Sequence, residues 1–298
     1  MYIVDFAKYL MRKSNIPIII YLIINVVLIT GILSMPFAAA GSIAILIGLL
    51  IYLFTLTIAI SPIGEIILRK RTGCNKITDP KVLTFIEPIF MEVYKKAKRM
   101  NENIPDDVDL YMNDSEDVNA FATGRRTVCI TKGLLRQPPE LIKATLGHEM
   151  GHLGHHDTDL LLIITVGNVI SNIFFVVIQM ANQVAALFIG LIGALFGGET
   201  GVIFVLLTRL CAWMTDMMIA VFVNIWTWLG TVLVMKSSRG NEYEADEFSF
   251  NLGYGYELCR LLDTFPKSND RGLFATLQSS HPDKDNRINR LRQLGVKY

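Results

Sequence analysis

Four of the five histidines in the 298-residue chain lie within nine residues, and two of them frame a glutamate. His148, Glu149 and His152 form the pattern H-E-x-x-H. On a helix, imidazoles four residues apart share a face and can converge on one metal ion, with the glutamate beside a metal-bound water. Zinc lowers the pKa of that water from about 15.7 to about 7, and the glutamate takes its proton as it attacks a peptide carbonyl. The pattern indicates metal-assisted peptide hydrolysis; two surface histidines on a soluble helix are the alternative.

The residues before the motif predict the helix that carries it. Pro138 and Pro139, followed by Glu140, are typical of a helix start, where proline fits the backbone and an acidic residue suits the helix dipole. Leu141 and Ala144 then fall at three- and four-residue spacing with the two motif histidines, which predicts one common face.

Two further histidines follow the motif, and we expect neither to bind the metal. His155 shares the face of His148, but seven residues correspond to about 10.5 Å of helix rise. Because zinc–nitrogen bonds are about 2.0–2.1 Å long, one straight helix cannot supply all three ligands. We therefore interpret His155 and His156 as polar residues at the end of the helix.

The third ligand is expected in residues 238–246, which follow a long apolar stretch of the chain that ends at residue 235. If this segment is helical, Glu242 and Asp246 share a face, and Glu244 points away. One carboxylate can complete a catalytic site of two histidines and one acid, and the other can accept the free N–H of a ligating imidazole. Capping or solvation of a helix by these carboxylates is the alternative.

The composition places the chain among membrane proteins. Hydrophobic residues make up 52% and charged residues 18%, with a mean hydropathy of +0.41. Soluble domains carry about 25% charged residues. These values exclude a disordered or collagen-like chain, and four cysteines without a C-x-x-C pair exclude a disulfide scaffold. The net charge of +1 gives no pull toward nucleic acid.

Charged residues are scarce in two blocks, 14–68 and 160–235, that are long enough to cross a bilayer. In the first block, residues 16–33 and 38–60 are each long enough to cross the bilayer as a helix, which takes roughly 20 residues, and Pro36 between them predicts a helical hairpin. A cleaved signal peptide is the alternative. In the second block we expect spans at 160–179 and 216–235. We interpret residues 180–215 as an interfacial or re-entrant connection, with two further spans as the alternative.

Basic residues flank the expected spans and predict their orientation. The positive-inside rule puts both termini and the charged parts of the chain in the cytoplasm. Four regions follow: a transmembrane hairpin (1–61), a first catalytic part (62–158), a second transmembrane pair (159–235) and a second catalytic part (236–298). The flanking residues are Lys8, Arg12, Lys13, Arg69, Lys70, Arg71, Lys76, Lys236 and Arg239.

With these elements in this order, the chain resembles the HtpX family of membrane zinc metalloproteases, which are relatives of the CAAX prenyl protease. The resemblance covers nearly the whole chain, and the order and spacing of its motifs are specific. Besides the early hairpin and the H-E-x-x-H motif, the matching segments are NAFATG at 119–124, TKGLL at 131–135, residues 238–246, SHP at 280–282 and Arg287-Ile288.

The resemblance implies a fold and a metal site. The fold would be mainly α, with about four transmembrane helices and a cytoplasmic α+β zincin-like domain that has a small sheet. His148, His152 and Glu242 would bind one zinc ion per chain, and Glu149 would be the general base. Asp246 would support a ligating imidazole.

The same resemblance implies residues that handle the substrate. Asn119, Ala120 and Phe121 would belong to a strand on which an extended peptide adds by β-augmentation. Our own interpretation of the β-branched residues predicts flanking strands at 108–112 and 127–131. His281 would act near the tetrahedral oxyanion, and Arg287 would position its segment.

Taken together, the sequence predicts a zinc endopeptidase that is multi-pass in the plasma (inner) membrane and has its catalytic part in the cytoplasm. By resemblance, it would cleave membrane or misfolded proteins in a stress response. Its partners would be these substrates and the lipid bilayer, and we expect no binding of nucleic acid. A site-two-type intramembrane protease, a CAAX-type processing protease and an inactive membrane scaffold are the alternatives. The sequence does not indicate the natural substrates or the oligomeric state.

Overall fold

The computed structural model describes residues 16–195, 198–264 and 284–298. The chain forms two compact units. The first comprises Ala59–Val166 and Thr231–Tyr298, together with the described residues up to Ile20, and the second comprises Tyr21–Ile58 and Gly167–Gly230. Each is described by itself.

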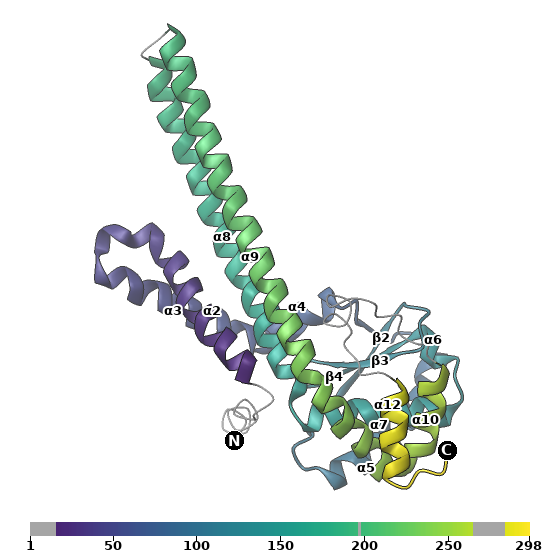
Figure 1. Ribbon diagram of the computed structural model, residues 1–298. Helices are drawn as coiled ribbons and strands as arrows, with labels where there is room; N and C mark the ends of the chain where they lie inside the picture. Colours follow the sequence, from purple (N-terminus) through teal and green to yellow (C-terminus); the bar gives the residue numbers. More distant parts are fainter. Residues whose placement is uncertain (1–15, 196–197, 265–283) are drawn as a thin grey trace. The chain divides into compact units, whose positions relative to one another are not determined.

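The second unit contains the early hairpin. Helix α2 (Ile16–Ser34) leads into the 3₁₀ helix η2 (Met35–Ala40), which has a proline in its first positions, and α3 (Ser42–Ala59) follows (Figure 1). The two helices approach closely at Gly48, where a Cβ atom would lie 2.5 Å from the carbonyl oxygen of Thr30. The helical hairpin predicted from the proline is therefore present.

Two long helices, α8 (Asp157–Leu195) and α9 (Gly198–Ser249), form a second hairpin. Within residues 180–215, which we interpreted as an interfacial or re-entrant connection, the chain is helical up to Leu195 and again from Gly198; its position relative to a membrane stays a prediction. The sequence has no proline from 157 to 249, so no proline breaks the hydrogen bonds within α8 or α9. Gly198, with φ +66°, begins α9 in a backbone conformation that suits glycine.

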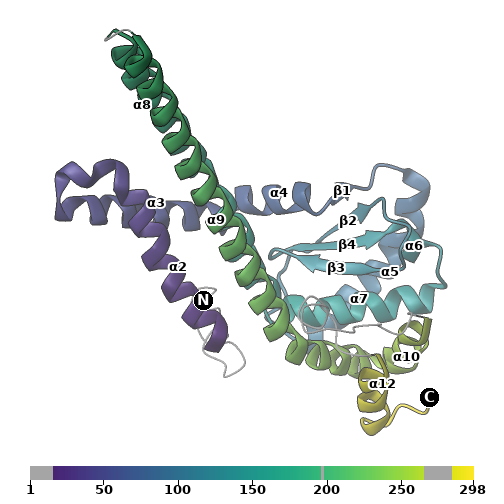
Figure 2. The ribbon, with the colours of Figure 1, turned by 45° about the horizontal axis from the view of Figure 1, so that its top comes forward.

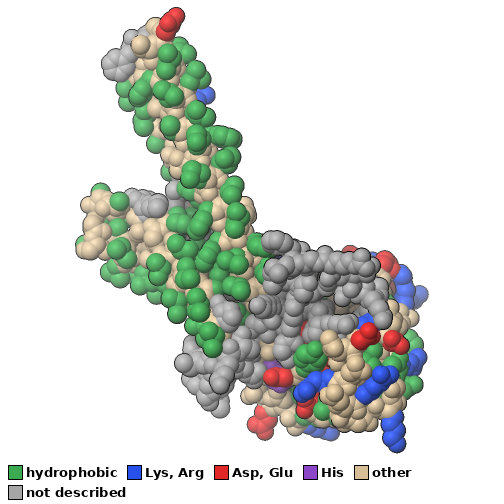
Figure 3. Space-filling view, in the orientation of Figure 1, with side chains coloured by type: hydrophobic (Ala, Val, Ile, Leu, Met, Phe, Trp, Pro, Cys, Tyr) green, Lys and Arg blue, Asp and Glu red, His purple; other side chains and the backbone are tan. Residues whose placement is uncertain are grey.

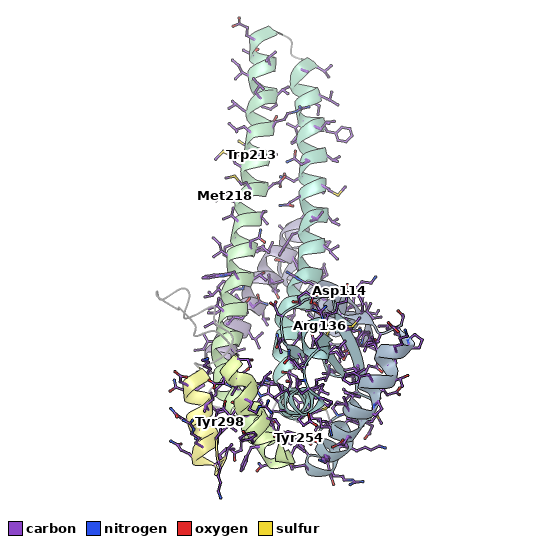
Figure 4. The ribbon with its side chains drawn as sticks, turned by 90° about the vertical axis from the view of Figure 1, so that its right-hand side faces the viewer. Asp114, Arg136, Trp213, Met218, Tyr254 and Tyr298 are labelled. Carbon is purple, nitrogen blue, oxygen red and sulfur yellow. The ribbon has the colours of Figure 1, made fainter. Side chains whose placement is uncertain are left out.

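Length and composition allow membrane spans within the described residues. Ser42–Ala59, Phe175–Leu195 and Gly198–Gly230 are long and apolar enough, and Ile18–Ser34 is a shorter apolar helix. Apolar side chains cover the face of the α8–α9 hairpin that Figure 3 displays. Figure 4 labels Trp213 and Met218, which project outward from α9 and are 57% and 66% exposed. Such an apolar surface suits lipid contact.

Hydrogen bonds link the helices inside the second unit. The Asn25 amide donates to the Tyr52 hydroxyl over 2.7 Å and accepts from the Trp226 indole N–H over 2.7 Å, so it joins α2, α3 and α9. Interhelical hydrogen bonds of this kind help transmembrane helices to associate.

The first unit places a four-stranded sheet against helices. The strand order is β1-β2-β4-β3; β2 and β4 are parallel, and the other two pairs are antiparallel (Figure 2). The strands predicted at 108–112 and 127–131 are observed as β2 and β4. The elements are α4 (Pro62–Arg71), β1 (Asn75–Lys76), α5 (Pro80–Met100), β2 (Asp109–Asn113), β3 (Ala120–Thr123), β4 (Thr127–Thr131), α6 (Lys132–Leu135), α7 (Pro139–Gly154), the end of α9, the π-helix η3 (Phe250–Tyr254), α10 (Gly255–Thr264) and α12 (Lys284–Gln293).

The core of this unit lies between the sheet and helices α5 and α7. Ile86, Phe90 and Val93 on α5 are buried at helical spacing, and they belong to one apolar cluster with Ile130 of β4 and Met150 of α7. The mainly α fold with a small sheet, expected from the resemblance, is confirmed. This core holds α7 rigidly beside the edge of the sheet (Figure 2).

Candidate active site

Helix α7 carries the H-E-x-x-H motif in a buried position. Pro138 is its N-cap residue and Pro139 its first residue, as the sequence predicts. The side chains of His148, Glu149 and His152 are buried, and every residue from 144 to 154 is buried with them. A helix enclosed on all sides holds its side chains in fixed rotamers, which suits a metal site.

The last turns of α9 pack directly on α7. A Cβ atom on Gly151 would lie 2.9 Å from the Cα atom of Ala245, so a larger residue would force the helices apart. The Ser249 hydroxyl donates to the carbonyl oxygen of Ala144 over 2.9 Å. This close packing brings the second predicted segment against the motif.

The three predicted metal ligands meet at one point. The ligating atoms of His148, His152 and Glu242 all lie within 4.8 Å of one another, and all three residues are buried. The two Nε2 atoms are 3.2 Å apart, and each is 3.4 Å from a carboxylate oxygen of Glu242. Two imidazole nitrogens and one carboxylate, with a fourth position left for water, are the donor set of catalytic zinc sites. The residues therefore fit a zinc ion.

Asp246 lies behind the ligands, as the sequence predicts. Its Oδ1 is 2.9 Å from Nδ1 of His148, the ring nitrogen that faces away from the ligand cluster. Such a carboxylate fixes the tautomer of a ligating imidazole and makes the ring a better donor to the metal. Glu244, one helical face away, is exposed.

Arg287, which the resemblance placed among the residues that support the site, completes a buried ion network whose contacts the sequence did not specify. From α12, its guanidinium donates to both oxygens of Asp246 over 2.7 and 2.6 Å, and its Nη1 lies 3.2 Å from Glu242. The predicted role of Arg287, holding the segment of His281, stays a prediction because residues 265–283 lie outside the described residues. The only sequence signal for the network was the resemblance at Arg287-Ile288.

These contacts shift the pKa values of the network. Burial favours the neutral form of Asp246, but the Arg287 charge and hydrogen bonds outweigh it and lower the pKa of the carboxyl. Burial alone would lower the pKa of His148, yet the hydrogen bonds with Asp246 and Glu242 raise it. The network therefore keeps Asp246 ionised beside the imidazole.

Glu149 contacts the edge strand of the sheet. Its Oε2 accepts a hydrogen bond from the backbone N–H of Ala122 over 2.6 Å. The Thr131 N–H donates to the Asn119 carbonyl, so by strand alternation Ala120 and Ala122 turn their N–H and C=O groups away from β4. Sequence reasoning missed Ala122, although it placed the strand correctly.

The predicted substrate residues have different surroundings in this strand. Asn119 is exposed, Ala120 is buried in the main core, and Phe121 packs on the other face of the sheet with Cys74 and Cys129. Within the described part of the chain, β3 has a neighbour on one side only. Its free edge is the place where an extended peptide could add.

The two histidines after the motif stand apart from the ligands. His155 caps the C-terminus of α7, and its ring centroid is 6.3 Å from that of Phe248. His156 has a φ of +59° at the junction with α8. Neither belongs to the metal-binding group found among the described residues.

The comparison with known families decides where the chain belongs. The model of "Peptidase family M48" matches residues 86–295, which is 210 of the 298 residues and includes every ligand described above. The chain belongs to peptidase family M48. The matched region also includes the edge strand β3 and Arg287, and the resemblance drawn from the motifs is confirmed.

Relatives within the M48 family include proteins named as HtpX proteases. A "Protease HtpX homolog" of Thermoplasma acidophilum is 38% identical over 99 residues, which cover 32% of this chain and 29% of the relative. A "Protease HtpX homolog" of Methanopyrus kandleri is 29% identical over 205 residues, covering 59% and 56%. "Protease HtpX" of Shewanella piezotolerans is 28% identical over 255 residues, covering 75% and 79%. The matches to the first two relatives thus span less than two thirds of those proteins.

Proposed function

We propose that the chain is a zinc endopeptidase of the membrane that cleaves membrane or misfolded proteins at the cytoplasmic face, in membrane protein quality control. The observation that carries this proposal is that the ligating atoms of His148, His152 and Glu242 lie within 4.8 Å of one another. The buried Glu149 lies on α7 between the two histidines. Membership of the M48 family and the names of the relatives support it.

Each side chain of the site has a distinct role in this proposal. Glu149 takes the proton of the attacking water and later delivers it to the leaving amine. The N–H of Ala122 donates to one Glu149 oxygen and so orients the carboxylate. Asp246 holds the imidazole of His148 in the tautomer that presents Nε2 to the metal, and Arg287 neutralises the excess negative charge.

The metal would be held by the two histidines and Glu242. When bound, zinc supplies the Lewis acidity that polarises the peptide carbonyl and lowers the pKa of the water. The free edge of β3 would bind the substrate in an extended conformation, which suits unfolded segments better than helices.

The test compares two glutamates on α7. The protein is purified in detergent, its bound zinc is measured, and casein cleavage and self-cleavage are followed. Glu149→Gln should lower the rate by about 10²–10⁴-fold. Glu140→Gln, at an exposed position of the same helix, should cleave like the wild type.

Two outcomes would contradict the proposal. If Glu149→Gln cleaves as fast as Glu140→Gln, Glu149 is not the general base. If the wild type retains no zinc and does not cleave, the chain is an inactive scaffold. The location is tested separately with a reporter fused after Lys76, which should report a cytoplasmic position.

A further inference from the structure

The turn at the end of the edge strand β3 is held by a glutamate of another helix. Gly124, with φ +63°, Arg125 and Arg126 form this turn. Oε1 of Glu65, on α4, accepts the backbone N–H of Arg125 over 3.1 Å. A Cβ atom on Gly124 would lie 3.2 Å from Cγ of Glu65, so the glutamate packs directly over the turn.

Glu65 is unusual in the sequence and in the structure. It is the only Asp, Glu, Lys or Arg between positions 14 and 68, and it is 8% exposed. A buried carboxylate is costly unless partners satisfy it. Its other partner is Arg69, whose Nη1 lies 3.7 Å from Oε2 and donates to the Thr127 hydroxyl over 3.2 Å. Helix α4 therefore binds the turn through Glu65 and the first residue of β4 through Arg69.

A second helix fixes the same turn. The Thr158 hydroxyl, at the start of α8, donates to the carbonyl oxygen of Gly124. The N–H of Arg125 and the carbonyl of Gly124 are thus both bound by side chains of other helices. A turn of one glycine and two arginines would otherwise be free to move.

The position of this turn sets the position of the catalytic edge. Strand β3 has four residues, and Ala122 is two residues from Gly124. The N–H of Ala122 is the group that donates to Glu149. A displacement of the turn therefore moves both the free edge of β3 and the donor to the general base.

We propose that Glu65 is a positioning residue for substrate binding. It holds β3 in the position, relative to Glu149, in which the free edge of the strand accepts an extended peptide. Thr158 acts on the same turn from the opposite side. This inference rests on the endopeptidase function proposed above. It assigns a role to a glutamate that lies outside the metal-binding group.

The test compares Glu65 with a surface glutamate of the same unit. Glu65→Ala removes the acceptor for Arg125, and Glu65→Gln keeps a carbonyl oxygen in its place. The control is Glu92→Gln on α5, since Glu92 is bound to Lys143 and Lys96 but is 42% exposed. The substrate is a quenched fluorescent peptide that spans a casein cleavage site found with the wild-type protein. For each variant, kcat, KM, zinc content and Tm are measured.

We expect Glu65→Ala to raise KM by about tenfold with unchanged zinc content, because displacement of a binding element by even 1 Å costs up to about 10²-fold. Glu65→Gln should restore KM to near the wild-type value, and Glu92→Gln should leave it unchanged. Thr158→Val should raise KM as Glu65→Ala does, and Thr158→Ser should restore it. The Thr158 pair decides the question if Glu65→Ala does not fold.

Three results would overturn the inference. In the first, Glu65→Ala and Thr158→Val keep the wild-type KM. In the second, both variants bind less zinc and have a lower Tm, but their folded, zinc-loaded fraction has the wild-type kcat and KM. The contacts would then serve only the stability of the fold. In the third, the wild type does not cleave, and the proposed function fails together with the role of Glu65. Cleavage by the wild type with an unchanged KM in both variants leaves the proposed function standing and removes the inference alone.

Discussion

Helix α9 carries two aspartates, one in each unit, and their partners differ in kind. Asp216, in the second unit, accepts hydrogen bonds from the amides of Asn182, over 3.1 Å, and Gln183 on α8. Asp246, in the first unit, binds the guanidinium of Arg287 and the imidazole of His148. Neutral donors satisfy the first carboxylate, and charged or ionisable groups satisfy the second.

The two aspartates differ in which property of the carboxylate the surrounding structure uses. Within an apolar hairpin, the hydrogen-bonding capacity of Asp216 has to be met, and the amides of two side chains meet it. At the candidate metal site, the charge of Asp246 is itself used, since it orients His148 and is balanced by Arg287. Loss of the Asp246 charge should therefore affect metal binding, whereas loss of the Asp216 charge should not.

The largest effect is expected from Asp246→Asn. The variant keeps the size and one oxygen, but it leaves Arg287 without its carboxylate and His148 with a weaker acceptor. Zinc affinity should fall by about 10–100-fold, measured by competition with a chromogenic chelator. Asp216→Asn is the matched control and should bind zinc like the wild type. Equal affinities of the two variants would remove the distinction between the two aspartates.

A smaller effect is expected from Arg287→Lys. Lysine keeps the charge but cannot donate in parallel to both oxygens of Asp246. Zinc affinity should fall by about tenfold, with a lower Tm of the purified protein. Arg290→Lys, on the same helix, changes a half-exposed arginine that lies 3.8 Å from Glu247 and serves as the control. If Arg287→Lys matches this control, the bidentate geometry is irrelevant and charge alone suffices.

The smallest effect is expected in the α8–α9 hairpin. Asn182→Leu removes one of the two amide donors to Asp216, and the stability of the hairpin in detergent should fall by about 0.6 kcal/mol. Unfolding in detergent with increasing denaturant measures this change. Zinc affinity and peptide cleavage should stay at wild-type values, and a clear loss of either would mean that Asp216 also serves the site.

Much of the candidate site could be predicted from the sequence, because its signals are local. The spacing of His148 and His152 already places both imidazoles on one helical face, and Pro138 and Pro139 mark where that helix begins. The spacing of Glu242 and Asp246 likewise implies one face of one helix. These inferences need only the periodicity of an α-helix.

The helical structure of residues 180–195 and 198–215 could not be predicted from composition alone. Gly198, Glu199 and Arg209 all lie within helix α9, because a glycine costs a helix only about 1 kcal/mol and no proline is present. Packing against a neighbouring helix outweighs that cost. At Gly193, a Cβ atom would lie 2.3 Å from the ring of Phe204, so the glycine serves close packing of α8 on α9.

By itself, the sequence determined the membrane character, the helix that bears the motif, and the residue types that can bind zinc, since each depends on composition or on spacing within one element. Only the tertiary structure decided which distant groups meet them. Arg287 reaches Asp246 across 41 positions, and Glu65 reaches the turn after β3 across 60. Ala122 reaches Glu149 through a backbone N–H, which no side-chain pattern can reveal. Contacts of this kind are set by how the elements pack, and helical or strand periodicity carries no information about them.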